Sequence, residues 1–330
     1  MRIAVFSSKP YDQEYFEKHR KEHDFDFVFF EASLNQNTAN LCNGFDVVCV
    51  FVNDKIDKET IKKLAKCNVG LIALRCAGYN NVDLEEAISN GIKVVRVPAY
   101  SPEAVAEHAL ALILTLNRKT HKAYNRIREG NFSLNKLIGF NLHNKTVGVI
   151  GTGQIGATFL KIMKGFGCKL IAYDLYPNED LKSIGVDYLS LKDLFKSADI
   201  ISLHCPLNPD TKHIINKNSL DQMKDGAMVI NTSRGGLIDT ADVIEALSHR
   251  KIGYLGIDVY EQEENIFYKD LSESIIDDDY ILRLNSFPNV LITSHQAYFT
   301  KEAMDEITTT TLNNIKAFKN GENLKNEVRP

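Results

Sequence analysis

Three polar side chains of the kinds that bind anions and transfer protons lie in the second half of the sequence. Arg234, Glu263 and His295 each follow, within a few residues, a run of apolar and β-branched residues. Such runs predict strands, and open α/β sheets bind ligands beyond the carboxyl ends of their strands. A guanidinium can bind a carboxylate through two parallel hydrogen bonds, and a histidine can donate or accept a proton. We therefore expect the three side chains to converge on one crevice.

A glycine-rich loop stands between a predicted strand, 146–150, and a predicted helix that continues through Met163. The loop and the first helical residues are Gly151, Gly153, Gln154, Ile155 and Gly156. Three glycines alone can mark any tight turn, but this strand–loop–helix context is what dinucleotide binding requires. The first glycine makes the turn, the second admits the pyrophosphate, and the third lets helix and strand approach closely. The amides at the start of the helix then face the phosphates.

Asp174 closes the next predicted strand, 170–173. A carboxylate in that place accepts hydrogen bonds from the adenosine ribose hydroxyls of a dinucleotide. Leu175 and Tyr176 follow it, so no arginine is at hand to bind a 2′-phosphate. NAD is therefore predicted over NADP. The alternative is that Asp174 only caps the next turn.

Strands alternate with helices along the whole chain, which predicts βαβ units and mainly parallel sheets. The expected strands of the first series are 3–6, 27–30, 47–52, 71–74 and 94–97. Those of the second series are 146–150, 170–173, 200–203, 228–231, 255–259 and 290–293. The fold class is therefore α/β, with two doubly wound, Rossmann-like parallel-sheet domains and an active-site cleft between them.

The character of the sequence changes at residue 101. Ser101 followed by Pro102 and Glu103 is typical of a helix start, and the helix behind it is apolar nearly all round. That helix suits a brace between domains or a subunit interface. A last helix, 301–318, follows the second series of strands and could return to the first domain. We expect a discontinuous substrate domain, 1–100 with 300–330, and an NAD-binding domain, 101–299.

The composition excludes several other classes of protein. The 330 residues include 39 basic and 43 acidic side chains, so no positive excess exists for binding nucleic acid. None of the six cysteines forms a C-x-x-C pair, and no metal site is expected. The apolar run at the N-terminus is too short for a signal peptide, and the longest apolar stretch, 109–116, is too short to span a membrane. We expect a soluble, cytoplasmic protein.

Several motifs together make the sequence recognisable. They are residues 75–83 (RCAGYNNVD), 98–102 (PAYSP), the glycine loop, 204–207 (HCPL) and the three segments that carry Arg234, Glu263 and His295. With these motifs the chain resembles the D-isomer-specific 2-hydroxyacid dehydrogenases over nearly its whole length. Within this family it is most similar to the fermentative NAD-dependent D-lactate dehydrogenases.

The resemblance implies a role for each candidate residue. Arg234 would bind the substrate carboxylate, whose other side would be held by the backbone amides of Ala77 and Gly78. His295 would protonate the carbonyl oxygen as the nicotinamide delivers hydride to the adjacent carbon. Glu263 would hold the imidazole and favour its cationic form.

Other positions follow from the same resemblance. The pattern D-V-Y-E-x-E selects Glu263 over Glu261 as the partner of the histidine. Further cofactor contacts are expected at Cys205, Pro206, Thr211, Thr232, Ser233 and Asp258, and substrate contacts at Tyr100 and Tyr298. His108, on the apolar helix, is expected to be structural. His204 is nearer the crevice, and a direct part in the site stays open for it.

Pyruvate and D-lactate are the leading substrate pair. The long interval from Glu263 to His295 and the segment 295–300 resemble the lactate branch. Tyr100 and Tyr298 would wall a pocket with room for little more than a methyl group. One alternative is a dehydrogenase for a larger 2-keto acid, and another is an NAD-sensing binding protein of the same fold. The resemblance and the apolar helix suggest a homodimer or a dimer of dimers.

Overall fold

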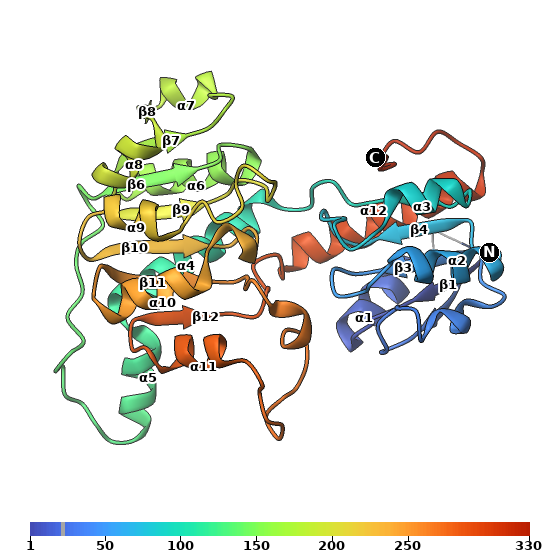
Figure 1. Cartoon of the computed structure of the whole chain (residues 1–330), viewed down its shortest axis with the longest axis horizontal. Helices are drawn as coiled ribbons and strands as arrows, with labels where there is room; N and C mark the ends of the chain where they lie inside the picture. The colour runs from blue at the N-terminus through green and yellow to red at the C-terminus, as the bar shows by residue number, and fades with distance from the viewer. Residues whose placement is uncertain (21–23) are drawn as a thin grey trace. The chain divides into compact units, whose positions relative to one another are not determined.

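The computed structural model describes residues 1–20 and 24–330. The chain divides into two compact units, which Figure 1 shows. Unit 1 consists of Met1–Ser101 together with Phe299–Pro330, and unit 2 is Pro102–Tyr298. The chain therefore leaves unit 1 once and returns to it once.

Unit 1 contains a five-stranded parallel sheet with the strand order β2-β1-β3-β4-β5. The strands are β1 (Arg2–Val5), β2 (Asp26–Phe29), β3 (Val47–Val50), β4 (Leu71–Leu74) and β5 (Lys93–Val95). The helices are α1 (Pro10–His19), η2 (Ala39–Cys42), α2 (Lys58–Lys66), α3 (Leu84–Ser89) and α12 (Lys301–Lys319). Every residue of β3 and β4 is buried, because helices cover both faces of the sheet. Val48 and Ile72 pack in one core, while Leu71 packs with Leu312 of α12 in the other.

Unit 2 contains a seven-stranded parallel sheet with the order β12-β11-β10-β9-β6-β7-β8. The strands are β6 (Thr146–Ile150), β7 (Lys169–Tyr173), β8 (Val186–Tyr188), β9 (Ile200–Leu203), β10 (Ala227–Asn231), β11 (Ile252–Ile257) and β12 (Val290–Ile292). The helices are α4 (Pro102–Arg118), α5 (Thr120–Arg128), α6 (Gln154–Gly165), α7 (Glu179–Ser183), α8 (Leu191–Ser197), α9 (Lys217–Gln222), η3 (Gly235–Leu237), α10 (Thr240–Ser248), η4 (Glu263–Asn265) and α11 (Asp279–Ser286). From β6 the chain runs outward through β7 and β8, and then returns to β9 on the other side of β6. Ligands bind at such a reversal of strand order.

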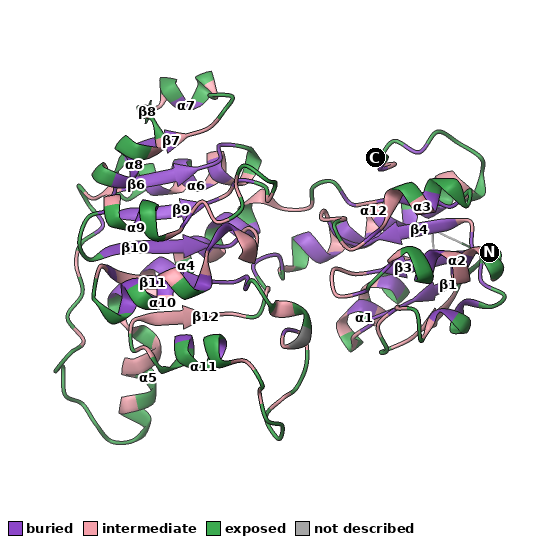
Figure 2. Ribbon diagram, in the orientation of Figure 1, coloured by how far each residue is buried: buried purple, intermediate pink, exposed green. Residues whose placement is uncertain are grey.

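Helix α4 belongs to the core of unit 2. Its buried residues Ala106, Ala109 and Ile113 pack in one cluster with Phe159 and Leu160 of α6, and the helix also contacts β11. Figure 2 colours the ribbon of both units by burial. Its other side carries exposed charged residues, among them Glu103, Glu107 and Arg118. The helix is thus amphipathic rather than apolar nearly all round.

The α/β class and the two parallel sheets are confirmed, but one strand was not expected. β8 is the edge strand beyond β7, and of its three residues only Val186 is buried. A strand this short has no apolar run of its own, so sequence periodicity does not reveal it.

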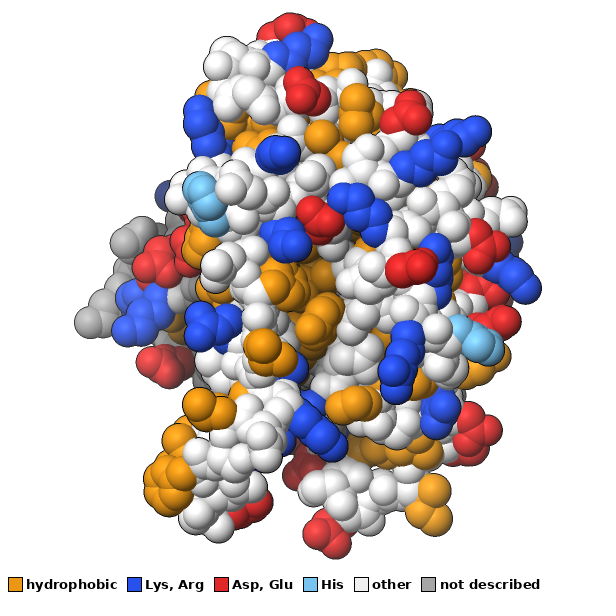
Figure 3. Space-filling view, turned by 90° about the vertical axis from the view of Figure 1, so that its left-hand side faces the viewer, with side chains coloured by type: hydrophobic (Ala, Val, Ile, Leu, Met, Phe, Trp, Pro, Cys, Tyr) orange, Lys and Arg blue, Asp and Glu red, His pale blue; other side chains and the backbone are white. Residues whose placement is uncertain are grey.

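Acidic and basic side chains are interspersed on the face shown in Figure 3, which fits the small net charge of −4.

Candidate functional site

His295 and Glu263 form a half-buried pair beyond the carboxyl ends of β12 and β11. His295 Nδ1 lies 2.8 Å from Glu263 Oε1, and the backbone N–H of Tyr260 donates to Glu263 Oε2 at 2.9 Å. Because an ionised carboxylate only accepts, we assign the hydrogen between the pair to Nδ1 of the histidine. The other ring nitrogen, Nε2, is then the one that can exchange a proton with a substrate.

The backbone of His295 has an unusual conformation that its neighbours maintain. Its φ of 52° lies in the left-handed region, which costs a non-glycine residue roughly 1–3 kcal/mol. The His295 N–H donates to the Asp258 carbonyl at 2.7 Å, and the Tyr268 hydroxyl donates to the His295 carbonyl at 3.1 Å. These two bonds hold the backbone of His295 at a defined place beyond the end of the strand.

Arg234 follows β10 and is half-buried. Its Nη1 donates to the carbonyl of Ser233 at 2.7 Å, and its own carbonyl accepts from Asn231 Nδ2 at 2.9 Å. Within the described part of the chain, its guanidinium has no ion pair with a carboxylate. A partly desolvated cation without a counter-charge is suited to binding an anion.

The loop of Arg234 lies against the loop that carries Glu263. A Cβ added to Gly235 would stand 2.1 Å from the carbonyl carbon of Tyr260 and 2.4 Å from the nitrogen of Glu261. Only a glycine permits this close approach of two backbones. The contact brings the loop of the unpaired arginine next to the loop of the histidine's partner.

The glycine loop after β6 has the geometry that a dinucleotide requires. Gly151 has a φ of 94°, and a Cβ there would stand 2.5 Å from the nitrogen of Cys205. A Cβ on Gly156 would stand 2.0 Å from the Gly151 carbonyl oxygen, so the third glycine lets α6 approach the loop. Around Gly153, by contrast, no described residue other than its neighbours along the chain has an atom within 4 Å of the added Cβ. This open space stands at the N-terminus of α6, where no side chain caps the amides of Gln154 and Ile155.

Asp174 lies beside the glycine loop at the end of β7. Its Oδ2 accepts from the N–H and the hydroxyl of Thr152 at 2.6 and 3.0 Å, and its Oδ1 accepts from the N–H of Tyr176 at 2.9 Å. The carboxylate therefore caps the next turn and is also held at the edge of the loop. Since Asp174 is only half-buried, it can accept further hydrogen bonds from a ribose.

The other expected cofactor residues differ in their surroundings. Burial raises the pKa of Cys205 to about 11, so its thiol is neutral, and its carbonyl accepts from the hydroxyl of Ser233 at 2.7 Å. Pro206 is exposed, and its carbonyl accepts from the hydroxyl of Thr211 at 2.7 Å. The Oγ1 of Thr232 is buried and has no hydrogen-bond partner in the described part of the protein. An unsatisfied hydroxyl at a strand end suits a ligand contact and, with the open space at Gly153, fits a bound dinucleotide.

The side chains of Asp258 and His204 both form hydrogen bonds within unit 2. The side chain of Asp258 is fully buried, and it accepts the N–H groups of Gln296 and Ala297 at 2.9 and 2.8 Å, so a contact with the cofactor stays a prediction. The ring of His204 packs on Phe159, with Nε2 2.8 Å from Ser202 Oγ. Burial lowers the pKa of His204 to about 3, so this imidazole stays neutral.

The expected substrate residues are divided between the units. Ala77 and Gly78 follow β4 in unit 1, where the Ala77 carbonyl accepts from Arg96 Nη1 at 2.8 Å. Tyr100 is half-buried in the same unit, while Tyr298 is buried in unit 2. Their part in substrate binding stays a prediction.

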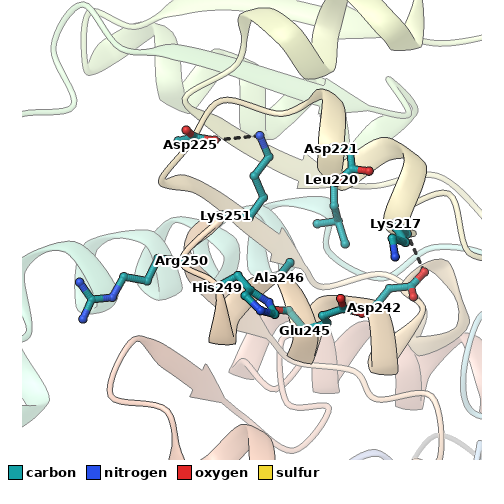
Figure 4. Close-up of a pocket in the computed structure, with 10 residues that line it drawn as sticks. All are labelled: Lys217, Leu220, Asp221, Asp225, Asp242, Glu245, Ala246, His249, Arg250 and Lys251. Atoms are coloured by element: carbon teal, nitrogen blue, oxygen red, sulfur yellow. Dashed lines mark hydrogen bonds and ion pairs between the residues drawn. The ribbon is translucent and has the colours of Figure 1, made fainter.

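A hollow of about 470 Å³ in unit 2 is separate from this site. Figure 4 shows that α9, α10 and the turns before β10 and β11 line it, so it lies at the amino ends of these strands. Its basic and acidic side chains are mixed, and Lys251 already donates to Asp225 at 2.8 Å. The site residues follow the carboxyl ends of the strands, at the opposite edge of the sheet.

Residues 1–20 and 24–330 contain neither a membrane-spanning helix nor a cluster of metal ligands. No helix there combines the length and the apolar character needed to cross a bilayer. No group of three or more histidine, cysteine, aspartate or glutamate side chains in these ranges could hold a metal ion.

Comparison with known proteins identifies the family. Residues 110–297 match the family model described as D-isomer specific 2-hydroxyacid dehydrogenase, NAD binding domain. The chain is 50% identical to D-lactate dehydrogenase of Escherichia coli, over 99% of this chain and all of that protein. The apo-structure of the Escherichia coli enzyme aligns with this chain with a TM-score of 0.92 and 49% identity, and the alignment covers 99% of this chain and 100% of that chain. The pyruvate reductase of Chlamydomonas reinhardtii has a TM-score of 0.94 and 46% identity, over 99% of this chain and 98% of that chain.

These matches decide the cofactor and the class of reaction. Because the matched family model is an NAD-binding domain, the prediction of NAD is confirmed. The protein is an NAD-dependent oxidoreductase that acts on a D-2-hydroxy acid. The chain belongs to the D-isomer-specific 2-hydroxyacid dehydrogenases.

Proposed function

We propose that this protein is a D-lactate dehydrogenase, which reduces pyruvate to D-lactate with NADH and catalyses the reverse reaction with NAD. The observation that carries the proposal is the half-buried guanidinium of Arg234, which has no carboxylate partner in the described residues and lies in a loop packed against that of Glu263. An anion-binding group beside a histidine–carboxylate pair suits a substrate that has a carboxylate next to a carbonyl. The proteins named D-lactate dehydrogenase and pyruvate reductase, at 50% and 46% identity, support this choice of substrate.

Each residue of the site then has a chemical role. Arg234 binds the carboxylate of pyruvate and thereby orients its carbonyl group. His295, protonated on both ring nitrogens, donates the Nε2 proton to the carbonyl oxygen, while Glu263 keeps the ring in place through Nδ1. NADH, when bound, supplies the hydride that reduces the carbonyl carbon. In the reverse direction neutral His295 accepts the hydroxyl proton of D-lactate.

The residues proposed to hold the cofactor lie around the glycine loop. The uncapped amides of α6 beside Gly153 bind the pyrophosphate, and Asp174 binds the adenosine ribose. Thr232 contributes the buried hydroxyl that lacks a partner among the described residues. A carboxylate at Asp174 also repels the 2′-phosphate of NADP, which explains a preference for NAD.

The decisive test is a panel of 2-keto acids from pyruvate to branched, larger acids, with NADH oxidation followed at catalytic protein concentration. We expect pyruvate to have the highest kcat/KM and the product to be the D isomer. A higher kcat/KM for a larger acid would instead make the protein a dehydrogenase for that acid. Stoichiometric NADH binding with no turnover of any acid would favour the NAD-sensing alternative.

We further propose a homo-oligomer, either a dimer or a dimer of dimers. A group of apolar side chains on α5 and the segment after it is exposed: Tyr124, Ile127, Phe132, Leu134 and Ile138. Several large apolar side chains exposed close together in the sequence suit a protein–protein interface. Light scattering after size-exclusion chromatography should give at least twice the mass of the chain, and Leu134→Ser with Ile138→Ser should lower the measured mass.

A cytoplasmic, fermentative role, in which pyruvate reduction regenerates NAD, is the setting we propose, and cell fractionation tests the location.

A further inference from the structure

A second histidine lies behind the segment that carries His295. His108, on α4, places Nε2 3.0 Å from the hydroxyl of Thr293 and 3.4 Å from Asp258 Oδ1. The hydroxyl of Thr293 donates in turn to Asp258 Oδ1 at 2.5 Å. The three side chains come from α4 and from the residues directly after β12 and β11, and all belong to unit 2.

Asp258 connects this group to the backbone around His295. Its carboxylate accepts the N–H groups of Gln296 and Ala297, and its carbonyl accepts the N–H of His295. Three successive amides are therefore bound to one residue. They fix the turn in which His295 has its left-handed conformation.

The carboxylate of Asp258 needs these partners because it is fully buried. Burial raises the pKa of Asp258, but hydrogen bonds from His108, Thr293 and Gln296 more than offset this and hold the pKa below its ordinary value. His108 is the only side chain with an ion-pair distance to Asp258 within the described residues. Loss of its imidazole would leave the buried charge with less compensation.

We propose that His108 is a positioning residue for the proton donor His295. Its Nε2–H donates to Thr293 Oγ1, which donates to Asp258, and Asp258 holds the backbone of the His295 turn. The ring of His108 has no place in the proton transfer itself. The sequence alone suggests only a structural role for this histidine, because its distance to Thr293 and Asp258 is a property of the fold.

The inference rests on the proposed function, and its test uses substitutions that change one link at a time. His108→Leu removes the donor, whereas His108→Gln retains an N–H at the end of a side chain of similar reach. Thr293→Val removes the hydroxyl with little change of shape, and Thr293→Ser retains it. His249→Leu is the matched control, because His249 ends α10 and bonds only to the carbonyl of Glu245 within the described residues.

We expect His108→Leu to lower kcat for pyruvate reduction about tenfold, because a proton donor whose turn is held less firmly meets the carbonyl oxygen less often in the reactive geometry. The Kd for NADH should change far less than kcat, since the glycine loop and Asp174 are untouched, and the KM for pyruvate should also change less than kcat. His108→Gln and Thr293→Ser should recover most of the rate. The double variant His108→Leu, Thr293→Val should be no slower than the worse single variant, because both changes break one chain of hydrogen bonds.

Several results would overturn the inference. They are an unchanged kcat in His108→Leu, a His108→Gln variant as slow as His108→Leu, fully additive losses in the double variant, or an equal loss in the His249→Leu control. Failure of the proposed function is distinguishable, since the wild-type protein would then not reduce pyruvate. In that case histidine NMR decides: His108→Leu should shift the ring signals of His295, assigned with His295→Ala, and unchanged signals would refute the positioning role.

Discussion

Gly235 lies directly after Arg234, at the point where η3 begins and the chain passes against the loop of Glu263. We predict that Gly235→Ala damages catalysis although the added methyl group touches no substrate. Its Cβ would stand 2.1 Å from the carbonyl carbon and 2.2 Å from the carbonyl oxygen of Tyr260. Both atoms belong to the backbone, so neither can rotate away as the end of a side chain can.

The size of the effect follows from these distances. A real Cβ essentially never comes closer than 3.0 Å to such atoms, so the two loops must separate by about 1 Å in a closely packed region. The Tyr260 N–H holds the carboxylate of Glu263, and Glu263 holds His295. A displacement of about 1 Å between the anion-binding group and the proton donor can cost about 100-fold in rate. Overpacking should also lower the free energy of unfolding by about 1–3 kcal/mol.

The assay is steady-state pyruvate reduction, with NADH binding and thermal unfolding measured on the same preparation. Gly236→Ala is the matched control, because its Cβ would meet only the flexible side chain of Leu207, at 3.1 Å. We expect kcat/KM to fall about 100-fold in Gly235→Ala and to stay near the wild-type value in Gly236→Ala. A folded Gly235→Ala variant with wild-type kinetics would refute the reasoning, since the loops would then tolerate separation.

Four further predictions concern single roles in the site. We expect the wild type to prefer NADH over NADPH about 30-fold, which corresponds to half of the roughly 4 kcal/mol of a like-charge contact. Asp174→Ala should reduce this preference. Equal kcat/KM for the two cofactors in the wild type would contradict the role of Asp174 in cofactor choice. Arg234→Lys should raise the KM for pyruvate and lower kcat, together by about 10–100-fold, because the ammonium group lacks the planar fork; unchanged kinetics would place the carboxylate elsewhere. His295→Ala should lower kcat by about 10²–10⁴-fold with NADH binding retained. Glu263→Gln should lower kcat for reduction with NADH binding retained, because the ring of His295 loses the charged acceptor that holds its Nδ1, and an unchanged kcat would contradict the pairing.

Much of the site is recognisable from the sequence alone, because its signals are local. The glycine loop needs only a strand before it and a helix after it, and β6 and α6 are present there. Arg234, Glu263 and His295 attract attention because each follows an apolar run, and burial on both faces of a central parallel strand makes such runs continuous. The family motifs then connect these residues to a reaction, which no spacing in the sequence supplies by itself.

Side-chain direction, by contrast, was decided by the tertiary structure. Asp258 lies one residue beyond β11, and the sequence suggests a cofactor contact there. Packing of the turn after β12 against β11 surrounds its carboxylate with the amides of Gln296 and Ala297. These partners are far from Asp258 in sequence, so no local pattern encodes the meeting.

Contacts between distant segments also explain why the roles of Gly235, His108 and the edge strand β8 became visible only in the fold. The apolar periodicity of α4 indicates a buried helix, but which neighbour meets His108 depends on how α4 crosses the sheet. Gly235 is one small residue in a polar loop until the backbone of Tyr260 is found against it. β8 is too short to have a pattern and forms because it pairs with β7. The sequence by itself determined the longer elements and the types of chemical group, since these depend on neighbours along the chain. The tertiary structure decided the edge strand β8 and which groups face one another, since both depend on contacts between distant segments.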